Sequence, residues 1–170
     1  LNPPVYFTST YSQKDQSEYV YSRGDNPTRR ALERNLAALE GGIDCRATAT
    51  GMAATSVVMH LFQPGDHIVS GTEVYGGTYR VFTKVFANLG LEFSFVDMRD
   101  LDAVRRAITP RTKCLWLETP SNPLLNLTDL AAAAKLARDA GAISVCDNTF
   151  MSPYFQRPFE HGVDIVVHST

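Results

Sequence analysis

Short apolar runs alternate with longer amphipathic segments along most of this chain. The short runs are bounded by loops such as QPGD, NLG and EHG, which is typical of buried strands. They predict strands at residues 45–49, 67–71, 91–97, 113–118, 143–147 and 163–169. The longer segments predict helices at residues 52–62, 78–89, 101–108 and 127–140. This alternation predicts an α/β fold with a mostly parallel sheet flanked by helices.

The first part of the chain follows a different pattern. Residues 1–25 are rich in Ser, Thr, Tyr and Pro and show no periodicity, so we expect an extended amino-terminal arm. A helix is predicted within NPTRRALERNLAALEGG, where Asn26 caps the first turn, Pro27 suits its first position and Gly41 ends it. Its leucines form one apolar stripe, made of Leu32, Leu36 and Leu39. We expect two regions, the arm at 1–25 and a domain at 26–170.

Composition and charge exclude some classes of partner. The 170 residues are 44% hydrophobic and 20% charged, with a formal net charge of −2 and both signs mixed along the chain. This gives no electrostatic case for binding nucleic acid or an anionic membrane surface. No apolar run approaches the roughly 20 residues of a membrane-spanning helix, and no leader peptide is evident. Because Cys45, Cys114 and Cys146 lack metal-like spacing, reduced thiols in a cytoplasmic protein are favoured over a disulfide or a metal site.

Candidate chemistry lies at the carboxyl ends of the predicted strands, where parallel sheets bind ligands. The first strand leads through ATATGMAAT into a helix, and Gly51 lets an anion approach the free N–H groups of the first turn. A plain strand-to-helix turn is the simpler interpretation of this stretch alone. No GxGxxG or Walker motif occurs, so the common dinucleotide and nucleoside triphosphate signatures are missing.

The later strand ends add further groups. Glycines in EVYGGTYR expose the ring of Tyr75, and prolines in TPSNP bracket Asn122 in a stiff loop. Strand ISVCD ends in Asp147, a carboxylate that needs a partner, either a structural arginine or the protonated ring nitrogen of a cofactor. The last strand ends in Ser169 and Thr170, whose hydroxyls could complete a phosphate site. Each feature alone is also explained by an ordinary loop.

The arm contains the stretch YVYSRGDNPTR, in which Tyr21 and Arg23 have alternate spacing. On an extended chain these side chains point the same way, and both are good phosphate donors. The alternative is a solvated arm. Taken together, a phosphate site, an aromatic face, a rigid amide and a carboxylate describe pyridoxal phosphate (PLP), whose ring needs stacking and whose nitrogen needs an acid.

The chain resembles a known family from about residue 3 to residue 170. The motifs that carry the resemblance, in order, are YSRGDNPTR, TGMAAT, VYGGTYR, ETPSNP, DNTFMSPYFQRP and DIVVHST. They resemble the γ-family of PLP enzymes that handle cysteine, homocysteine and methionine, which includes cystathionine γ-lyases, cystathionine γ-synthases, methionine γ-lyases and homoserine-ester sulfhydrylases. The resemblance implies the large cofactor domain of the aspartate-aminotransferase-like (fold type I) PLP enzymes.

The resemblance implies a role for residues on the phosphate side. Gly51 and Met52 match the backbone donors to the cofactor phosphate, and Ser169 matches a side-chain donor. Tyr21 and Arg23 match the pair that reaches the phosphate of a neighbouring subunit's cofactor. A homo-oligomer, expected to be a dimer of dimers, follows from that pair.

Other residues are matched to the cofactor ring and the substrate. Tyr75 resembles the tyrosine that stacks on the ring, contacts substrate and assists proton transfer, and Asp147 resembles the partner of the ring nitrogen. These two are the expected catalytic residues. Thr149 packs beside the ring in the family, and Asn122 matches a residue near the ring hydroxyl and the substrate carboxylate.

The family strand continues to a lysine that forms the Schiff base, expected here two residues after Thr170. We therefore expect this chain to be a fragment that lacks the lysine and a carboxyl-terminal domain. The stretch DNTFMSPYFQRP is most similar to cystathionine γ-lyases, with the synthases close behind. Thr50 replaces the usual serine, and Gly77 replaces the cysteine that methionine γ-lyases tend to carry. The expected activity is γ-elimination from cystathionine in transsulfuration. The alternatives are γ-replacement, methionine γ-lyase activity and a non-catalytic scaffold.

Overall fold

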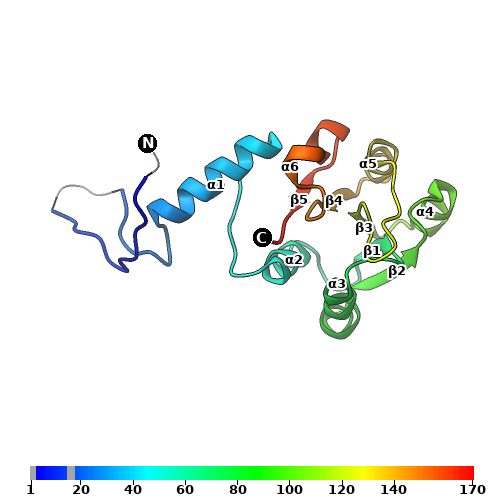
Figure 1. The fold of residues 1–170 in the computed structure, drawn as a ribbon. Coiled ribbons are helices and arrows are strands. Elements are labelled where there is room, and N and C mark those ends of the chain that lie inside the picture. Colours follow the sequence, from blue (N-terminus) through cyan, green and yellow to red (C-terminus); the bar gives the residue numbers. More distant parts are fainter. Residues whose placement is uncertain (1–2, 15–17) are drawn as a thin grey trace. The chain divides into compact units, whose positions relative to one another are not determined.

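The computed structural model describes residues 3–14 and 18–170, and Figure 1 shows its elements. The chain forms two compact units, residues 1–47 and residues 48–170. The first unit contains helix α1 (Pro27–Glu40), and the second contains a five-stranded sheet with its helices. The mostly parallel α/β fold predicted from the sequence is confirmed.

All strand pairs of the second unit are parallel. The strands are β1 (His67–Gly71), β2 (Glu92–Val96), β3 (Thr112–Glu118), β4 (Ile143–Asp147) and β5 (Ile165–Val167), in the order β2-β1-β3-β4-β5. The chain therefore starts in the interior of the sheet, builds one edge, and then crosses back over β1 to build the other. Because the strands are parallel, their carboxyl ends lie along one edge of the sheet, which is where ligands bind in folds of this kind.

Helices cover both faces of this sheet (Figure 1). They are α2 (Gly51–Met59), α3 (Gly76–Val81), α4 (Leu101–Ala107), α5 (Leu130–Asp139) and the short α6 (Ser152–Phe155). Helix α3 continues through a π-turn at Phe82–Phe86 and a 3-10 turn at Ala87–Leu89, and a further 3-10 turn spans Pro158–His161.

Two apolar clusters form the core, one on each face. Leu115 and Leu117 of β3 pack in the cluster that α4 and α5 cover, while Cys114 and Trp116 pack in the cluster that α2 and the π-turn cover. Adjacent residues of β3 thus enter opposite clusters, as strand alternation requires. Near-continuous apolar runs are the sequence signature of such strands, because both of their faces are buried.

The strand predicted at 45–49 is wrong. Residues 42–48 form no regular element, and the backbone N–H of Ala47 donates to the carboxylate of Glu33 at 2.9 Å. Arg46 pairs with Asp44 beside it. A strand requires a neighbouring backbone that accepts its hydrogen bonds, and here side chains take that place.

The arm is organised by a chain reversal. Thr10 and Tyr21 form an isolated antiparallel bridge, and the N–H groups of Gly24 and Asp25 donate to the carbonyl of Tyr21. This turn places the guanidinium of Arg23 5.0 Å from the centroid of the Tyr21 ring. The two side chains therefore lie together because of a turn, not because of strand alternation.

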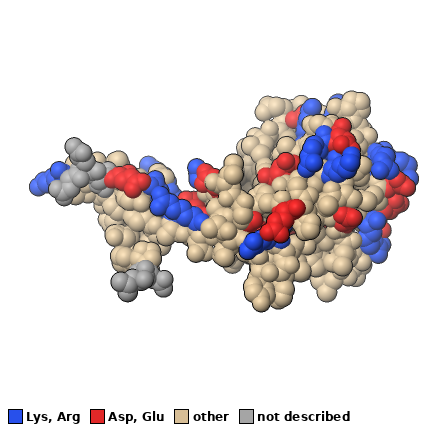
Figure 2. Space-filling view, turned by 90° about the horizontal axis from the view of Figure 1, so that it is seen from above, with Lys and Arg blue, Asp and Glu red and all other residues tan. Residues whose placement is uncertain are grey.

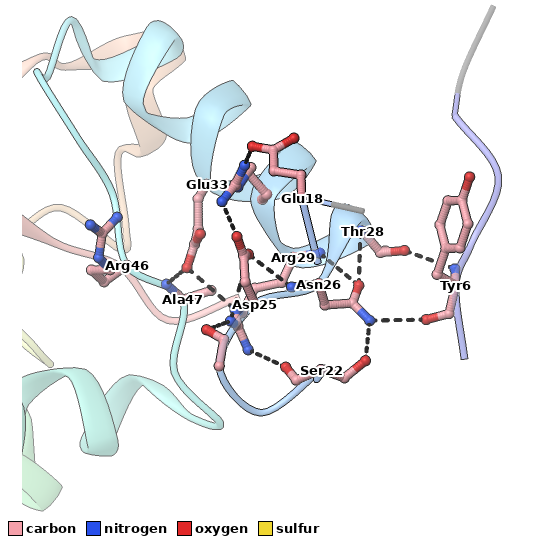
Figure 3. A network of polar contacts seen from close by, with 12 residues as sticks. Tyr6, Glu18, Ser22, Asp25, Asn26, Thr28, Arg29, Glu33, Arg46 and Ala47 are labelled. Carbon is pink, nitrogen blue, oxygen red and sulfur yellow. Dashed lines mark hydrogen bonds and ion pairs between the residues drawn. The ribbon is translucent and has the colours of Figure 1, made fainter. Parts of the chain in front are cut away.

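Asn26 joins this arm to helix α1 (Figure 3). Its Oδ1 accepts the N–H groups of Thr28 and Arg29, which confirms the predicted cap. Its Nδ2 donates to the carbonyl of Tyr6 at 3.3 Å and to the hydroxyl of Ser22 at 2.9 Å. One amide thus satisfies the first turn of the helix and fastens two stretches of the arm to it.

The described surface carries charges of both signs, and the three cysteines are free. On the face in Figure 2, basic and acidic residues lie side by side. Arg111 and Glu92 form one exposed ion pair. Cys114 and Cys146 are buried and Cys45 is partly buried, and burial raises the pKa of the Cys114 thiol, which keeps it protonated. Within the described ranges, no helix is long and apolar enough to cross a membrane, and no group of His, Cys, Asp or Glu is arranged to hold a metal ion.

Candidate functional site

A cavity of about 340 Å³ opens at the carboxyl ends of β3, β4 and β5. All of the site residues predicted in the second unit line it, namely Gly51, Met52, Tyr75, Asn122, Asp147, Thr149 and Ser169. They come from separate strand ends and from the first turn of α2. The structure therefore brings together groups that are spread over more than a hundred residues of sequence.

Strand alternation explains why these residues meet. On three neighbouring strands, an apolar residue packs in the cluster below the cavity and a polar residue follows two positions later on the same face. These pairs are Trp116 and Glu118 on β3, Val145 and Asp147 on β4, and Val167 and Ser169 at the end of β5. The apolar layer thus ends where the polar cavity begins.

The start of α2 forms an anion cradle. Thr50 caps the helix by accepting the N–H of Ala53 at 3.0 Å, and the N–H groups of Gly51 and Met52 are first-turn donors that the helix itself cannot use. A Cβ on Gly51 would lie 2.5 Å from the Cβ of Ser169 and 2.7 Å from its Oγ. Only glycine lets the serine hydroxyl come this close to the helix start, and a phosphate fits this donor set.

Asp147 is held by hydrogen bonds to one of its oxygens. Its Oδ1 accepts the backbone N–H of Thr149 at 3.0 Å and the Thr149 hydroxyl at 2.6 Å. The same hydroxyl oxygen accepts the backbone N–H of Ser169 at 2.9 Å. No hydrogen bond from the residues described in 3–14 and 18–170 reaches Oδ2, so this oxygen suits a protonated ring nitrogen. Thr149 therefore orients Asp147, in addition to lining the cavity.

Tyr75 precedes the first residue of α3 and is about half exposed. A Cβ on Gly77 would lie 2.4 Å from Cε1 of its ring and 3.0 Å from the sulfur of Met52. The ring thus occupies space that any larger residue at 77 would claim. An aromatic face beside the cavity and a carboxylate in its wall are the two features that a pyridine ring requires.

Glu118 is a cavity residue that sequence reasoning missed. Its Oε2 accepts the backbone N–H of Tyr75 at 2.8 Å. Burial raises the pKa of Glu118 to about 7; the bond from Tyr75 opposes this rise, and the neighbouring charge of Asp147 adds to it. The available signal was its position two residues after Trp116, which places it on the cavity face.

Asn148 follows Asp147 in the sequence and is fully buried. Its Nδ2 donates to the carbonyl of Gln156 at 2.8 Å, and the Gln156 amide donates to Asn148 Oδ1 at 2.9 Å and to the carbonyl of Thr119 at 3.0 Å. These bonds tie the loop after β4 to the loop after β3. Alternation directs Asn148 away from the cavity, which suits this supporting role.

Tyr21 and Arg23 belong to the first unit, apart from the unit that contains the cavity. Both are at the surface of that unit, with the guanidinium over the tyrosine ring. Their contact with a neighbouring subunit's cofactor stays a prediction.

Comparison with known proteins gives one consistent result. The family model for Cys/Met metabolism PLP-dependent enzymes matches residues 1–170. A protein of Herpetosiphon aurantiacus named "Probable cystathionine gamma-synthase" is 51% identical, over 98% of this chain and 53% of that protein. The cystathionine beta-lyase of Coxiella burnetii is 52% identical, over 98% of this chain and 44% of that protein. This chain thus spans about half the length of the curated relatives it matches.

A solved structure shares the fold closely. The crystal structure of cystathionine gamma-lyase from Lactobacillus plantarum, complexed with L-serine, matches with a TM-score of 0.93 and 52% sequence identity. The match covers 97% of this chain and 44% of that one.

Proposed function

Since this chain belongs to the Cys/Met metabolism PLP-dependent enzyme family, we propose that the complete protein cleaves cystathionine at its γ-carbon. The products would be cysteine, 2-oxobutanoate and ammonia, as in transsulfuration. PLP is the cofactor of the family, and the cavity fits it. The observation that carries the proposal is the convergence of Gly51, Tyr75, Asp147 and Ser169 on one cavity at the strand ends.

The residues of this chain would divide the work by position. The N–H groups of Gly51 and Met52 and the hydroxyl of Ser169 would hold the phosphate of PLP, and Asp147 Oδ2 would accept a hydrogen bond from the ring nitrogen. When bound, PLP supplies an electron sink for bonds broken next to the substrate's amino group.

The remaining cavity residues would act on the substrate side. Tyr75 would cover the ring face and handle a proton at its phenolic oxygen, and the amide of Asn122 would orient the substrate carboxylate. Thr149 would keep Asp147 aimed through its two hydrogen bonds to Oδ1. The catalytic lysine is expected two residues after Thr170.

The choice of γ-lyase rests on the stretch DNTFMSPYFQRP and on Gly77. A cysteine at 77, as methionine γ-lyases tend to carry, would require the Tyr75 ring to move, because even a Cβ there lies 2.4 Å from it. This supports a position of the Tyr75 ring that differs from the position of the matching tyrosine in methionine γ-lyases. The alternatives are γ-replacement, as a γ-synthase performs, and β-elimination, which the name of the relative from Coxiella burnetii suggests.

Assembly and location complete the proposal. Tyr21 and Arg23 would reach the phosphate of a neighbouring subunit's cofactor, which makes the dimer the smallest active form and a tetramer the expected assembly. The three free thiols support a reducing compartment such as the cytoplasm.

The first test uses the complete protein loaded with PLP and reduced with borohydride. We expect the pyridoxyl mass on the lysine two residues after Thr170, and the absence of any labelled residue would instead favour a non-catalytic scaffold. The products from cystathionine then separate the activities. Cysteine with 2-oxobutanoate indicates γ-elimination, and homocysteine with pyruvate indicates β-elimination. Faster formation of cystathionine from a homoserine ester and cysteine than its breakdown indicates γ-replacement.

A further inference from the structure

Two carboxylates connect the loop after β1 with the loop after β3. Glu118, the last residue of β3, accepts the backbone N–H of Tyr75 at 2.8 Å. The backbone N–H of Asn122 lies close enough to lower the pKa of the same carboxyl group. One side chain thus binds the backbone of the expected ring-stacking residue and lies beside that of the expected substrate-binding residue.

The connection also runs in the opposite direction. Glu73, two residues before Tyr75, accepts the hydroxyl of Ser121 at 2.8 Å and the side-chain amide of Asn126. Ser121 is buried, and its Oγ in turn accepts the backbone N–H of Asn126 at 3.1 Å. Each loop therefore supplies a carboxylate that binds groups of the other loop. These bonds surround a small cavity of about 20 Å³ that Glu118 separates from the cofactor cavity.

We propose that Glu73 and Glu118 form a reciprocal clasp that fixes Tyr75 and Asn122 relative to each other across the cofactor cavity. Glu118 is then a positioning residue that acts on the cofactor through Tyr75. The inference deepens the proposed function, because the two residues it positions are those assigned to the ring and the substrate. Tyr75 is about half exposed and directly precedes α3, and its backbone N–H, which no bond within that helix uses, is held by Glu118.

The clasp carries a pH dependence that a purely steric support would lack. A carboxylate accepts a hydrogen bond about twice as strongly as its neutral form. Because the pKa of Glu118 is raised to about 7, the bond from Tyr75 strengthens as the pH rises through that value. The charged and titratable groups around Glu118 are Asp147 on the neighbouring strand and, around the small cavity, Glu73, Asp97 and Arg99.

The test is single-residue hydrogen exchange at the Tyr75 amide, in the complete protein without PLP. Glu118→Ala removes the acceptor, and we expect exchange at least about tenfold faster. Glu118→Gln keeps the size and an acceptor oxygen, so an intermediate rate is expected. Glu73→Gln should accelerate exchange at the side-chain amide of Asn126, which donates to Glu73. Glu160→Gln is the matched control, since Glu160 is exposed and paired with Arg157, and it should change neither rate.

The decisive readout is the pH dependence of Tyr75 protection. Protection should rise with a midpoint near pH 7 in the native protein and in Glu160→Gln, and should be flat in Glu118→Gln. Exchange at Tyr75 within twofold of native in both Glu118 variants would overturn the clasp. If Glu118→Ala also loses protection along β3, that variant is unfolded and Glu118→Gln decides. Because this exchange needs no cofactor, the result stands even where PLP binding or the cystathionine assay contradicts the proposed function.

Discussion

The two units of this chain are stabilised in different ways. In the second unit, buried apolar side chains form clusters on both faces of the sheet, and the largest of them, Trp116, is fully buried. In the described parts of the first unit, 3–14 and 18–47, Glu40 is the one buried residue, and Leu32 and Leu39 of the predicted stripe are about half exposed. Its organisation comes from polar contacts, with Asn26 at their centre.

This difference teaches where function is supported in each unit. In the second unit, the polar cavity residues follow directly after buried apolar residues of the same strands. Packing of those apolar residues therefore holds the backbone of the cavity in place. In the first unit, a turn presents Tyr21 and Arg23, and polar contacts hold that turn, namely backbone hydrogen bonds to the Tyr21 carbonyl and the ion pair of Arg30 with Asp25. We therefore expect the second unit to respond to changes of volume and the first to changes of polar groups.

The largest expected effect is the loss of core volume. Leu115→Ala removes a fully buried side chain between α5 and the sheet, and should lower the free energy of unfolding by about 2–5 kcal/mol. Leu32→Ala, the same substitution at an exposed position of α1, should change it by less than about 0.5 kcal/mol. Urea unfolding of both variants in the complete protein measures this. Similar losses in the two variants would mean that the first unit also has a core.

The second-largest expected effect comes from adding volume at the anion cradle at the start of α2. Gly51→Ala introduces a methyl group 2.5 Å from the Cβ of Ser169, so the helix start and the strand end must separate. We expect PLP to bind at least about tenfold more weakly, which corresponds to about 1.4 kcal/mol. Titration of the protein without cofactor, followed by PLP fluorescence, gives the dissociation constant. Gly76→Ala is the control, because a Cβ there meets nothing closer than 3.5 Å.

A polar change should act on the first unit alone. Asn26→Ala removes the helix cap and the donors to Tyr6 and Ser22, and should cost about 1–2 kcal/mol of local stability. Hydrogen exchange should accelerate in peptides from the first unit and stay unchanged in those from 48–170. Asn35→Ala, at an exposed position of the same helix, should be neutral or slightly stabilising. Equal acceleration in both units would contradict the separation.

Acidification should also distinguish the units, because every histidine of the chain lies in the second unit. His67 is buried at the start of β1, where its ring bonds Thr112 Oγ1 at 2.8 Å and Ser94 Oγ at 2.9 Å. Burial lowers the pKa of His67, so the unfolded state takes up its proton first. The stability that His67 contributes is therefore present above about pH 6.5 and is lost as the pH falls, by at most about 1.4 kcal/mol per pH unit.

The measurement must isolate His67 from Glu118, whose raised pKa has the opposite sign: protonation below about pH 7 favours the folded state. We therefore compare urea unfolding of His67→Gln with the native protein between pH 7 and pH 5. The difference should shrink as the pH falls. His161→Gln, at an exposed position, is the control and should leave the pH dependence of stability unchanged. If the stability difference between His67→Gln and the native protein stayed constant with pH, His67 would not cause the pH dependence.

Much of the fold was readable from local pattern. Apolar runs located β1 and β4 at their observed bounds, and the helix limits at Asn26 and Gly41 followed from capping chemistry. The family motifs predicted seven site residues in the second unit, and all seven line the cavity. The strand at 45–49 failed because a short run of suitable residues predicts a strand only where a partner backbone exists.

The sequence by itself determined which side chains stand at strand ends, because alternation and helix capping depend on near neighbours along the chain. Only the tertiary structure decided which ends meet. The order β2-β1-β3-β4-β5 places Glu118 beside Asp147. The fold also lets the Glu118 carboxylate accept the backbone N–H of Tyr75, which is 43 residues away in the sequence. Such contacts depend on strand order and register, which buried apolar faces select through packing and not through any local signal. That is why the expected cofactor residues were found in advance, whereas the clasp beneath them was not.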